Sequence, residues 1–230
     1  MDRNYIDLIK ERPELFRNSG EEGEIRILTG SEEIMSIEEE LQKEIGILYE
    51  DDYIILLRDA VIFPDMSRGT YIRIIPREAD GGVVILPVLE EKILLLRHYR
   101  HSLRRFVWEV PRGFGEAGLT AEENAVKELA EETGIIDPVL EYLGKVCPDS
   151  GTRSDQVSVF RVKLSPAYTF KSRDEKEGID AYRLVSKREL RELVGSGDMI
   201  DGFTLSAVAL ACLKENTEDK DKYEQISLSF

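Results

Sequence analysis

A row of glutamates in residues 111–135, PRGFGEAGLTAEENAVKELAEETGI, is the part of the sequence with the clearest chemistry. Glu128, Glu131 and Glu132 are spaced i, i+3 and i+4, so on a helix their carboxylates project from one side. Like charges at this spacing destabilise an isolated helix by about 0.2–0.5 kcal/mol per pair. A divalent cation would relieve that repulsion, and carboxylate oxygens suit a hard ion such as Mg²⁺ or Mn²⁺.

The neighbouring residues predict the helix that must position these carboxylates. Thr120 and Glu123 have the T-x-x-E spacing of a capping box, and Gly134 supplies a C-terminal stop. We therefore expect a helix from about residue 121 to residue 133. Three glycines precede it and allow a backbone to approach a ligand closely, namely Gly113, Gly115 and Gly118.

Two other interpretations of this segment remain open. The glutamates could form a solvated helix face, in which Lys127 makes i,i+4 ion pairs with Glu123 and Glu131. The glycines also match the G-x-G-x-x-G pattern of dinucleotide-binding proteins, which would indicate a nicotinamide-dependent oxidoreductase. In that fold, however, the helix begins inside the glycine run. Here the cap, Thr120, follows the last glycine, and the surrounding strands read as hairpins.

Short β-rich runs on both sides of this helix predict the sheet that carries it. They are YIILLR, TYIRII, VVILPVL, KILLLR and FVWEV before the helix, and VLEYLGKV, QVSVFRVKL and DAYRLV after it. Two helices follow: SKRELRELV, where Ser186 and Glu189 are spaced as a capping box, and TLSAVALACL. This order predicts a mixed α/β fold with helices layered on a sheet.

Composition narrows the classes of function. The chain has 230 residues, and 31 Lys+Arg against 46 Asp+Glu give a net charge of −15, which opposes docking onto nucleic acid or an anionic membrane. Cys147 and Cys212 have no C-x-x-C spacing, which excludes a zinc ribbon and is typical of a cytoplasmic protein. No run has the length and apolarity of a signal peptide or a membrane span. We expect a cytoplasmic protein that binds neither nucleic acid nor membrane.

Residues 113–135 closely resemble the Nudix box, G-x5-E-x7-R-E-U-x-E-E-x-G-U, in which U is aliphatic. The match begins at Gly113 and places the R-E-U-x-E-E core at residues 127–132. Two positions depart from the pattern, because Leu119 stands where the family has Glu and Lys127 where it has Arg. If those two family residues pair, their joint replacement removes a support of the helix. A Nudix-fold binding or regulatory module with little turnover is therefore the alternative to an enzyme.

The resemblance covers about residues 45–215 and is greatest to the ADP-ribose pyrophosphatase branch of the Nudix hydrolases. It implies a Nudix-type α/β/α sandwich and a homodimer that uses Mg²⁺ or Mn²⁺. The implied reaction is hydrolysis of a nucleoside diphosphate linked to a sugar, most simply ADP-ribose to AMP and ribose 5-phosphate. With the composition, it divides the chain into an acidic extension (1–45), a β-rich dimerisation segment (46–78), a Nudix domain (79–216) and a charged tail (217–230).

The resemblance also assigns roles to the carboxylates. Glu175, in the acidic loop SRDEKEGIDAYRLVSKREL, matches the catalytic base of the family, with Glu177 in reserve. An acidic surface loop without a catalytic role is the alternative. The implied metal ligands are Glu128, Glu132, Glu131, either directly or through water, and the backbone carbonyl of Arg112; Glu131 is also counted among the catalytic residues.

Other roles are implied upstream and downstream of the box. Arg100 would contact a phosphate or ribose of the substrate, and Glu109 would support the metal site, as would Lys127. Gly151 lies in CPDSGTRSDQVSVF, which resembles the substrate loop. Trp108 is a candidate for stacking on the base of the substrate, with a half-buried core position as its alternative.

Overall fold

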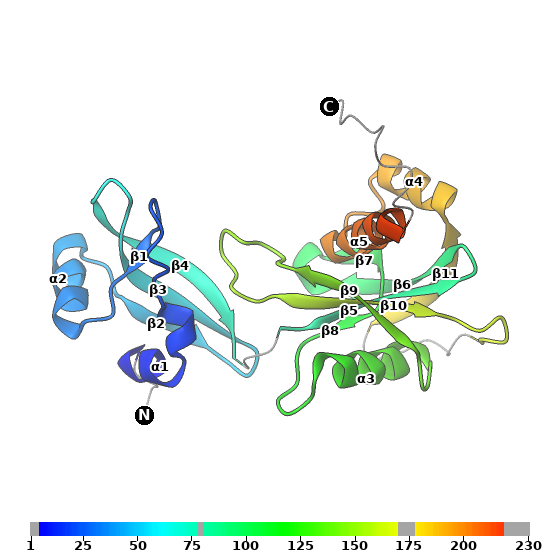
Figure 1. Cartoon of the computed structure of the whole chain (residues 1–230), viewed down its shortest axis with the longest axis horizontal. Helices are drawn as coiled ribbons and strands as arrows, with labels where there is room; N and C mark the ends of the chain where they lie inside the picture. The colour runs from blue at the N-terminus through cyan, green and yellow to red at the C-terminus, as the bar shows by residue number, and fades with distance from the viewer. Residues whose placement is uncertain (1–4, 78–80, 170–177, 219–230) are drawn as a thin grey trace. The chain divides into compact units, whose positions relative to one another are not determined.

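The computed structural model describes residues 5–77, 81–169 and 178–218, which form two compact units (Figure 1). The N-terminal unit comprises Met1–Ala79 and Asp149–Asp155, and the C-terminal unit comprises Asp80–Pro148 and Gln156–Phe230. None of the helices in the described ranges is both long enough and apolar enough to cross a membrane.

The N-terminal unit is built on an antiparallel sheet whose central strand is β3 (Ile54–Ile62). The other strands all pair with β3: β1 (Arg26–Ile27), β2 (Gly46–Glu50) and β4 (Arg68–Pro76). Its helices are α1 (Tyr5–Glu11), η1 (Pro13–Phe16) and α2 (Ser31–Leu41). Leu8 of α1 and Ile37 of α2 are fully buried in one cluster with Ile55 and Leu57 of β3. The first 45 residues therefore supply part of the core of this unit.

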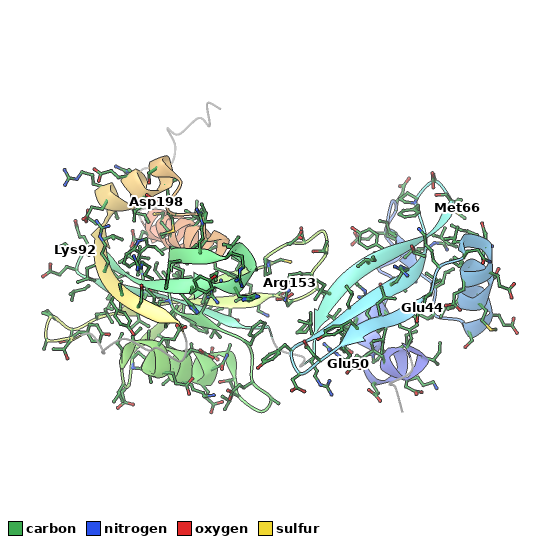
Figure 2. The ribbon with its side chains drawn as sticks, turned by 180° about the vertical axis from the view of Figure 1, so that it is seen from behind. Glu44, Glu50, Met66, Lys92, Arg153 and Asp198 are labelled. Atoms are coloured by element: carbon green, nitrogen blue, oxygen red, sulfur yellow. The ribbon has the colours of Figure 1, made fainter. Side chains whose placement is uncertain are left out.

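The C-terminal unit contains a seven-stranded mixed sheet in the order β11-β6-β5-β10-β9, with β7 paired to β6 and β8 to β5. β10 runs parallel to β5, and the other strand pairs are antiparallel. Figure 2 shows this unit from behind, with Lys92 labelled at the start of β6. The strands are β5 (Val83–Leu89), β6 (Lys92–Arg100), β7 (Arg105–Glu109), β8 (Arg112–Gly113), β9 (Leu140–Val146), β10 (Val157–Lys163) and β11 (Ile179–Ser186).

Helices cover both faces of this sheet. In Figure 1, α3 (Ala121–Thr133) lies on one face, and α4 (Lys187–Ser196) and α5 (Gly202–Glu218) lie on the other; a short η2 (His101–Leu103) joins β6 to β7. Side chains alternate between the faces of a strand. Accordingly, Val83 and Ile85 pack in the cluster under α3, whereas Val84 and Leu86 pack in the cluster under α4 and α5. The predicted mixed sheet between helical layers is confirmed.

Both predicted capping boxes are present. The Thr120 side chain accepts a hydrogen bond from the Glu123 N–H, and the Glu123 carboxylate accepts one from the Thr120 N–H, so α3 begins at Ala121 as expected. Gly134 ends α3 with a left-handed φ of 77°. Ser186 and Glu189 make the same reciprocal pair at α4.

The segment that contains β7 and β8 changes its pairing partner from β6 to β5. β7 pairs with β6, with Glu109 opposite Leu96, whereas β8 pairs with β5, with Arg112 opposite Val84. β5 and β6 pair with each other only near their hairpin, and residues 105–113 lie between these two strands beyond it. This crossing brings residues 109–113 to the start of the loop that leads into α3.

Candidate active site

Two of the α3 glutamates lie against the backbone of β8. The N–H of Arg112 donates a hydrogen bond of 3.1 Å to Oε2 of Glu132. A Cβ placed on Gly113 would overlap the carboxylate of Glu128. The first glycine of the loop is therefore needed because its missing side chain leaves the space that the Glu128 carboxylate occupies.

A second glycine makes room for β8 from the other side. A Cβ on Gly82 would overlap the carbonyl oxygen of Gly113, so the two backbones approach closely just before Val83 pairs with Gly113. The sequence interpretation above missed Gly82. The available signal was the Gly81-Gly82 pair immediately before a strand, which is typical of a close backbone approach.

Glu132 is buried beside two other carboxylates, those of Glu128 and Glu109. The residue is only 5% exposed. Burial, followed by the charges of Glu128 and Glu109, raises its pKa to about 8, although the Arg112 N–H and the charge of Arg100 act in the opposite direction. Near neutral pH the Glu132 carboxyl group therefore retains a proton unless a cation is nearby.

A divalent cation fits these donors. Glu128 and Glu132 offer carboxylate oxygens, and their mutual repulsion in a buried setting is what a cation relieves. Within the described ranges, no three His, Cys, Asp or Glu side chains form a ready-made ligand group. A cation would thus use the two glutamates together with backbone carbonyls or water. Glu131 is more exposed, and its Oε1 lies 3.9 Å from Nζ of Lys127.

Glu109 is the fully buried centre of a charged network. Arg100 holds it with two hydrogen bonds, one from Nε to Oε2 at 2.8 Å and one from a terminal nitrogen to Oε1. Nδ1 of His98 lies 3.2 Å from Oε1, and a terminal nitrogen of Arg112 lies 3.6 Å from Oε2. Burial raises the pKa of Glu109, but His98, Arg100 and Arg112 outweigh burial and lower it. An ionised Glu109 therefore fixes the guanidinium of Arg100.

Lys127 has a carboxylate partner in the glycine loop. Its Nζ donates a hydrogen bond to Oε1 of Glu116, and this bond raises the pKa of Lys127. Glu116 thus supplies a carboxylate partner for Lys127 where position 119 has none, and the effect of Leu119 and Lys127 on turnover stays a prediction. The glycine loop is therefore connected to α3 through Glu116, three residues before Leu119.

We expect the Glu116–Lys127 pair to contribute measurably but modestly to turnover. Glu116→Gln and Lys127→Gln should each lower kcat/KM by no more than about fivefold, because both side chains are partly exposed to solvent. The kcat/KM of the double variant should be no lower than that of the less active single variant, because all three variants lose the same interaction. Glu122→Gln, also in α3, is the control. Strictly additive effects would show that the two residues do not act together.

The structure places two of the remaining predicted residues, Trp108 and Gly151. Trp108 is partly buried and packs against the core on the α4 and α5 side, which favours the core interpretation. Gly151 belongs to the N-terminal unit, where its carbonyl accepts a hydrogen bond of 3.0 Å from the Tyr71 hydroxyl. Glu175 and Glu177 lie outside the described residues.

The glycine loop does not form a dinucleotide-binding unit. α3 begins at Ala121, beyond Gly118, so its N-terminus does not lie inside the glycine run. β8, the strand before the loop, pairs antiparallel with β5. The observed cluster instead combines buried carboxylates with a fixed arginine, Arg100. This combination suits a cation and a phosphate bound side by side.

Comparison with known proteins gives a consistent result. Residues 79–201 match the family described as NUDIX domain. The chain is 31% identical to an ADP-ribose pyrophosphatase of Bacillus subtilis (strain 168) over 137 residues, 59% of this chain and 74% of the relative. It is 33% identical to an ADP-sugar pyrophosphatase of Mus musculus over 94 residues, 39% and 43% of the two chains. A solved structure described as an ADP compounds hydrolase has a similar fold, with a TM-score of 0.59, 19% identity and coverage of 77% and 93%.

Proposed function

The chain belongs to the NUDIX family, and from that premise we propose that it hydrolyses the pyrophosphate bond of a nucleoside diphosphate linked to a sugar. ADP-ribose, cleaved to AMP and ribose 5-phosphate, is the substrate that we propose first, because a relative 31% identical over 137 residues is an ADP-ribose pyrophosphatase. The observation that carries the proposal is the pair of carboxylates, Glu128 and Glu132, held against the β8 backbone.

Each residue of the cluster has a task in this reaction. Glu128 and Glu132 would hold the divalent metal, for which we propose Mg²⁺ or Mn²⁺. When bound there, the metal would neutralise charge on the phosphate oxygens and so favour attack of water on phosphorus. Arg100, fixed by Glu109, would bind a second anionic oxygen of the substrate. Since Glu109 already neutralises much of its charge, Arg100 serves more to orient the phosphate than to attract it.

The attacking water needs a base, and we propose Glu175 for this role with Glu177 in reserve. Glu175→Gln should lower kcat by about 100-fold or more, the range for losing a positioned general base. Metal affinity should stay near the wild-type value, because the ligand glutamates lie on α3. Glu177→Gln serves as the matched control. A normal kcat in Glu175→Gln together with a large loss of kcat in Glu177→Gln would assign the role of base to Glu177 instead.

The decisive experiment is an assay of ADP-ribose, sugar nucleotides and dinucleotides with Mg²⁺ and with Mn²⁺. We expect ADP-ribose to yield AMP and ribose 5-phosphate, and excess EDTA to stop the reaction. Undiminished turnover in EDTA would contradict the metal mechanism. Tight binding of ADP-ribose without release of AMP would instead support the alternative of a binding or regulatory module.

Two further proposals concern the oligomeric state and the cellular location of the protein. We propose a homodimer formed through residues 46–78, which contain large exposed apolar side chains such as Tyr49, Tyr53 and Ile72. Light scattering coupled to gel filtration would give the mass directly. A cytoplasmic location remains a prediction from the cysteine pattern, and Cys147 and Cys212 are not joined in a disulfide.

A further inference from the structure

We propose that Thr204 and Asp201, at the start of α5, are positioning residues for the metal site, because they fix the backbone of residues 110–113 against which the α3 glutamates lie. The inference deepens the proposed function and rests on it. Both residues lie about 70 or more positions beyond the glutamates in sequence and outside the Nudix-like motif.

The need for such residues arises where the chain changes its strand partner. Glu109 is the last residue paired with β6, and Arg112 is the first paired with β5. Between them, Pro111 has no N–H, and its carbonyl accepts a hydrogen bond of 2.9 Å from the Ile85 N–H. Val110 is completely buried, so its N–H requires a partner that neither strand ladder supplies.

Thr204 is that partner. Its Oγ1 accepts a hydrogen bond of 3.0 Å from the Val110 N–H and donates one of 2.7 Å to Oδ2 of Asp201. The same Asp201 oxygen accepts a bond of 2.8 Å from the Thr204 N–H, so Asp201 caps α5 and sets the direction of the hydroxyl. Thr204 is fully buried, so its hydroxyl is shielded from bulk solvent.

Arg112 adds a second connection between α5 and the same short segment. One of its terminal nitrogens lies 3.4 Å from Oδ1 of Asp201. Its guanidinium carbon lies 4.8 Å from the ring centroid of Phe203, in the first turn of α5. The Arg112 side chain is thereby held on the α5 side, while its N–H contacts Glu132 of α3.

The segment is therefore fixed from both helical layers. α3 and α5 lie on opposite faces of the sheet (Figure 1), and residues 110–113 contact both helices within four positions. A shift of Val110 toward α5 or away from it would move the Arg112 N–H and the Gly113 backbone, which Glu132 and Glu128 contact. Thr204 and Asp201 thus act on the cation through this backbone.

Direct measurement of Mn²⁺ binding without substrate tests the inference. Thr204→Val keeps the shape of the side chain and removes the hydroxyl, and we expect Mn²⁺ affinity to fall by about 10- to 100-fold, the range for residues that support metal ligands. Thr204→Ser keeps the hydroxyl and should stay within about threefold of wild type. Asp201→Asn should lie between them, and it provides a second variant if Thr204→Val fails to fold.

The control separates positioning from general stability. Val208→Ala removes packing between α5 and the same core but no hydrogen bond to residues 110–113, so it should lower Tm while Mn²⁺ affinity stays unchanged. Equal losses of affinity in Val208→Ala and Thr204→Val would overturn the inference, as would wild-type affinity in Thr204→Val. A wild-type chain that binds no Mn²⁺ would overturn the proposed metal site and this inference together. Normal metal binding without cleavage of any pyrophosphate would contradict the proposed function alone.

Discussion

Replacing Glu132 with Gln should lower kcat/KM by on the order of a thousandfold, because the bound metal supplies several kcal/mol of charge stabilisation in reactions of this kind. The substitution preserves the size of the side chain, and the amide oxygen can still accept the hydrogen bond from the Arg112 N–H. Only the charge is lost. We therefore expect folding to be retained and metal affinity and turnover to fall together.

The pH dependence of metal binding gives a second measure of the same variant. Burial and the charges of Glu128 and Glu109 raise the pKa of Glu132 to about 8. A cation binds the ionised carboxylate, so below that pKa it must displace a proton. Apparent Mn²⁺ affinity should therefore rise with pH up to about 8 and then level off.

Calorimetry in two buffers of different ionisation enthalpy measures that proton. At pH 7 the wild-type chain should release close to one proton for each Mn²⁺ bound, and Glu132→Gln should release almost none. Glu122→Gln is the matched control, because this glutamate lies on the same helix, is exposed and is not among the proposed ligands. A wild-type affinity that does not change between about pH 6.5 and about pH 9 would contradict the assignment of Glu132 as a buried ligand.

The sequence predicted the elements of the C-terminal unit well because their signals are local. A capping box is complete within four residues, as Thr120 and Glu123 illustrate, and the alternation of Val83, Val84 and Ile85 follows from strand geometry alone. The spacing of the α3 glutamates is local in the same sense. These features could be predicted without knowing which distant parts of the chain pack together.

Contacts between distant residues could not be predicted in this way. The bond between Val110 and Thr204 joins residues that are 94 positions apart. Its existence depends on how β7 and β8 divide between two strands. The partner of Lys127 was missed for a related reason: the loop turns at Gly118 with a left-handed φ of 83°, and Glu116 rather than residue 119 reaches α3.

The N-terminal residues show how composition can hide burial. Acidic residues outnumber basic residues in the first 45 positions, which favours a solvated segment. A few apolar side chains nevertheless suffice to bind this segment to the sheet, because they are concentrated on single faces of short helices. Buried in the core of the N-terminal unit are Tyr5, Leu8, Phe16, Ile34 and Ile37.

Gly113→Ala is expected to disrupt the metal site through a single added methyl group. That methyl would overlap the carboxylate of Glu128, and the carboxylate must move because the backbone of residue 113 is held by its pairing with Val83. The displaced atoms belong to the end of a flexible side chain, so the fold should persist. We expect Mn²⁺ affinity and kcat/KM each to fall by about 100-fold or more, as for loss of a ligand's support.

A second substitution should partly reverse the effect of Gly113→Ala, which distinguishes displacement of the Glu128 carboxylate from general damage to the fold. Glu128→Asp shortens the side chain by one methylene, so in the Gly113→Ala background its carboxylate can withdraw from the new methyl and recover part of the lost Mn²⁺ affinity. In the wild-type background the same change should weaken binding. Gly195→Ala in α4 is the matched control, since an added Cβ there meets nothing within 4 Å. Wild-type affinity in Gly113→Ala would mean that the Glu128 carboxylate does not need its place beside this glycine in order to bind the metal.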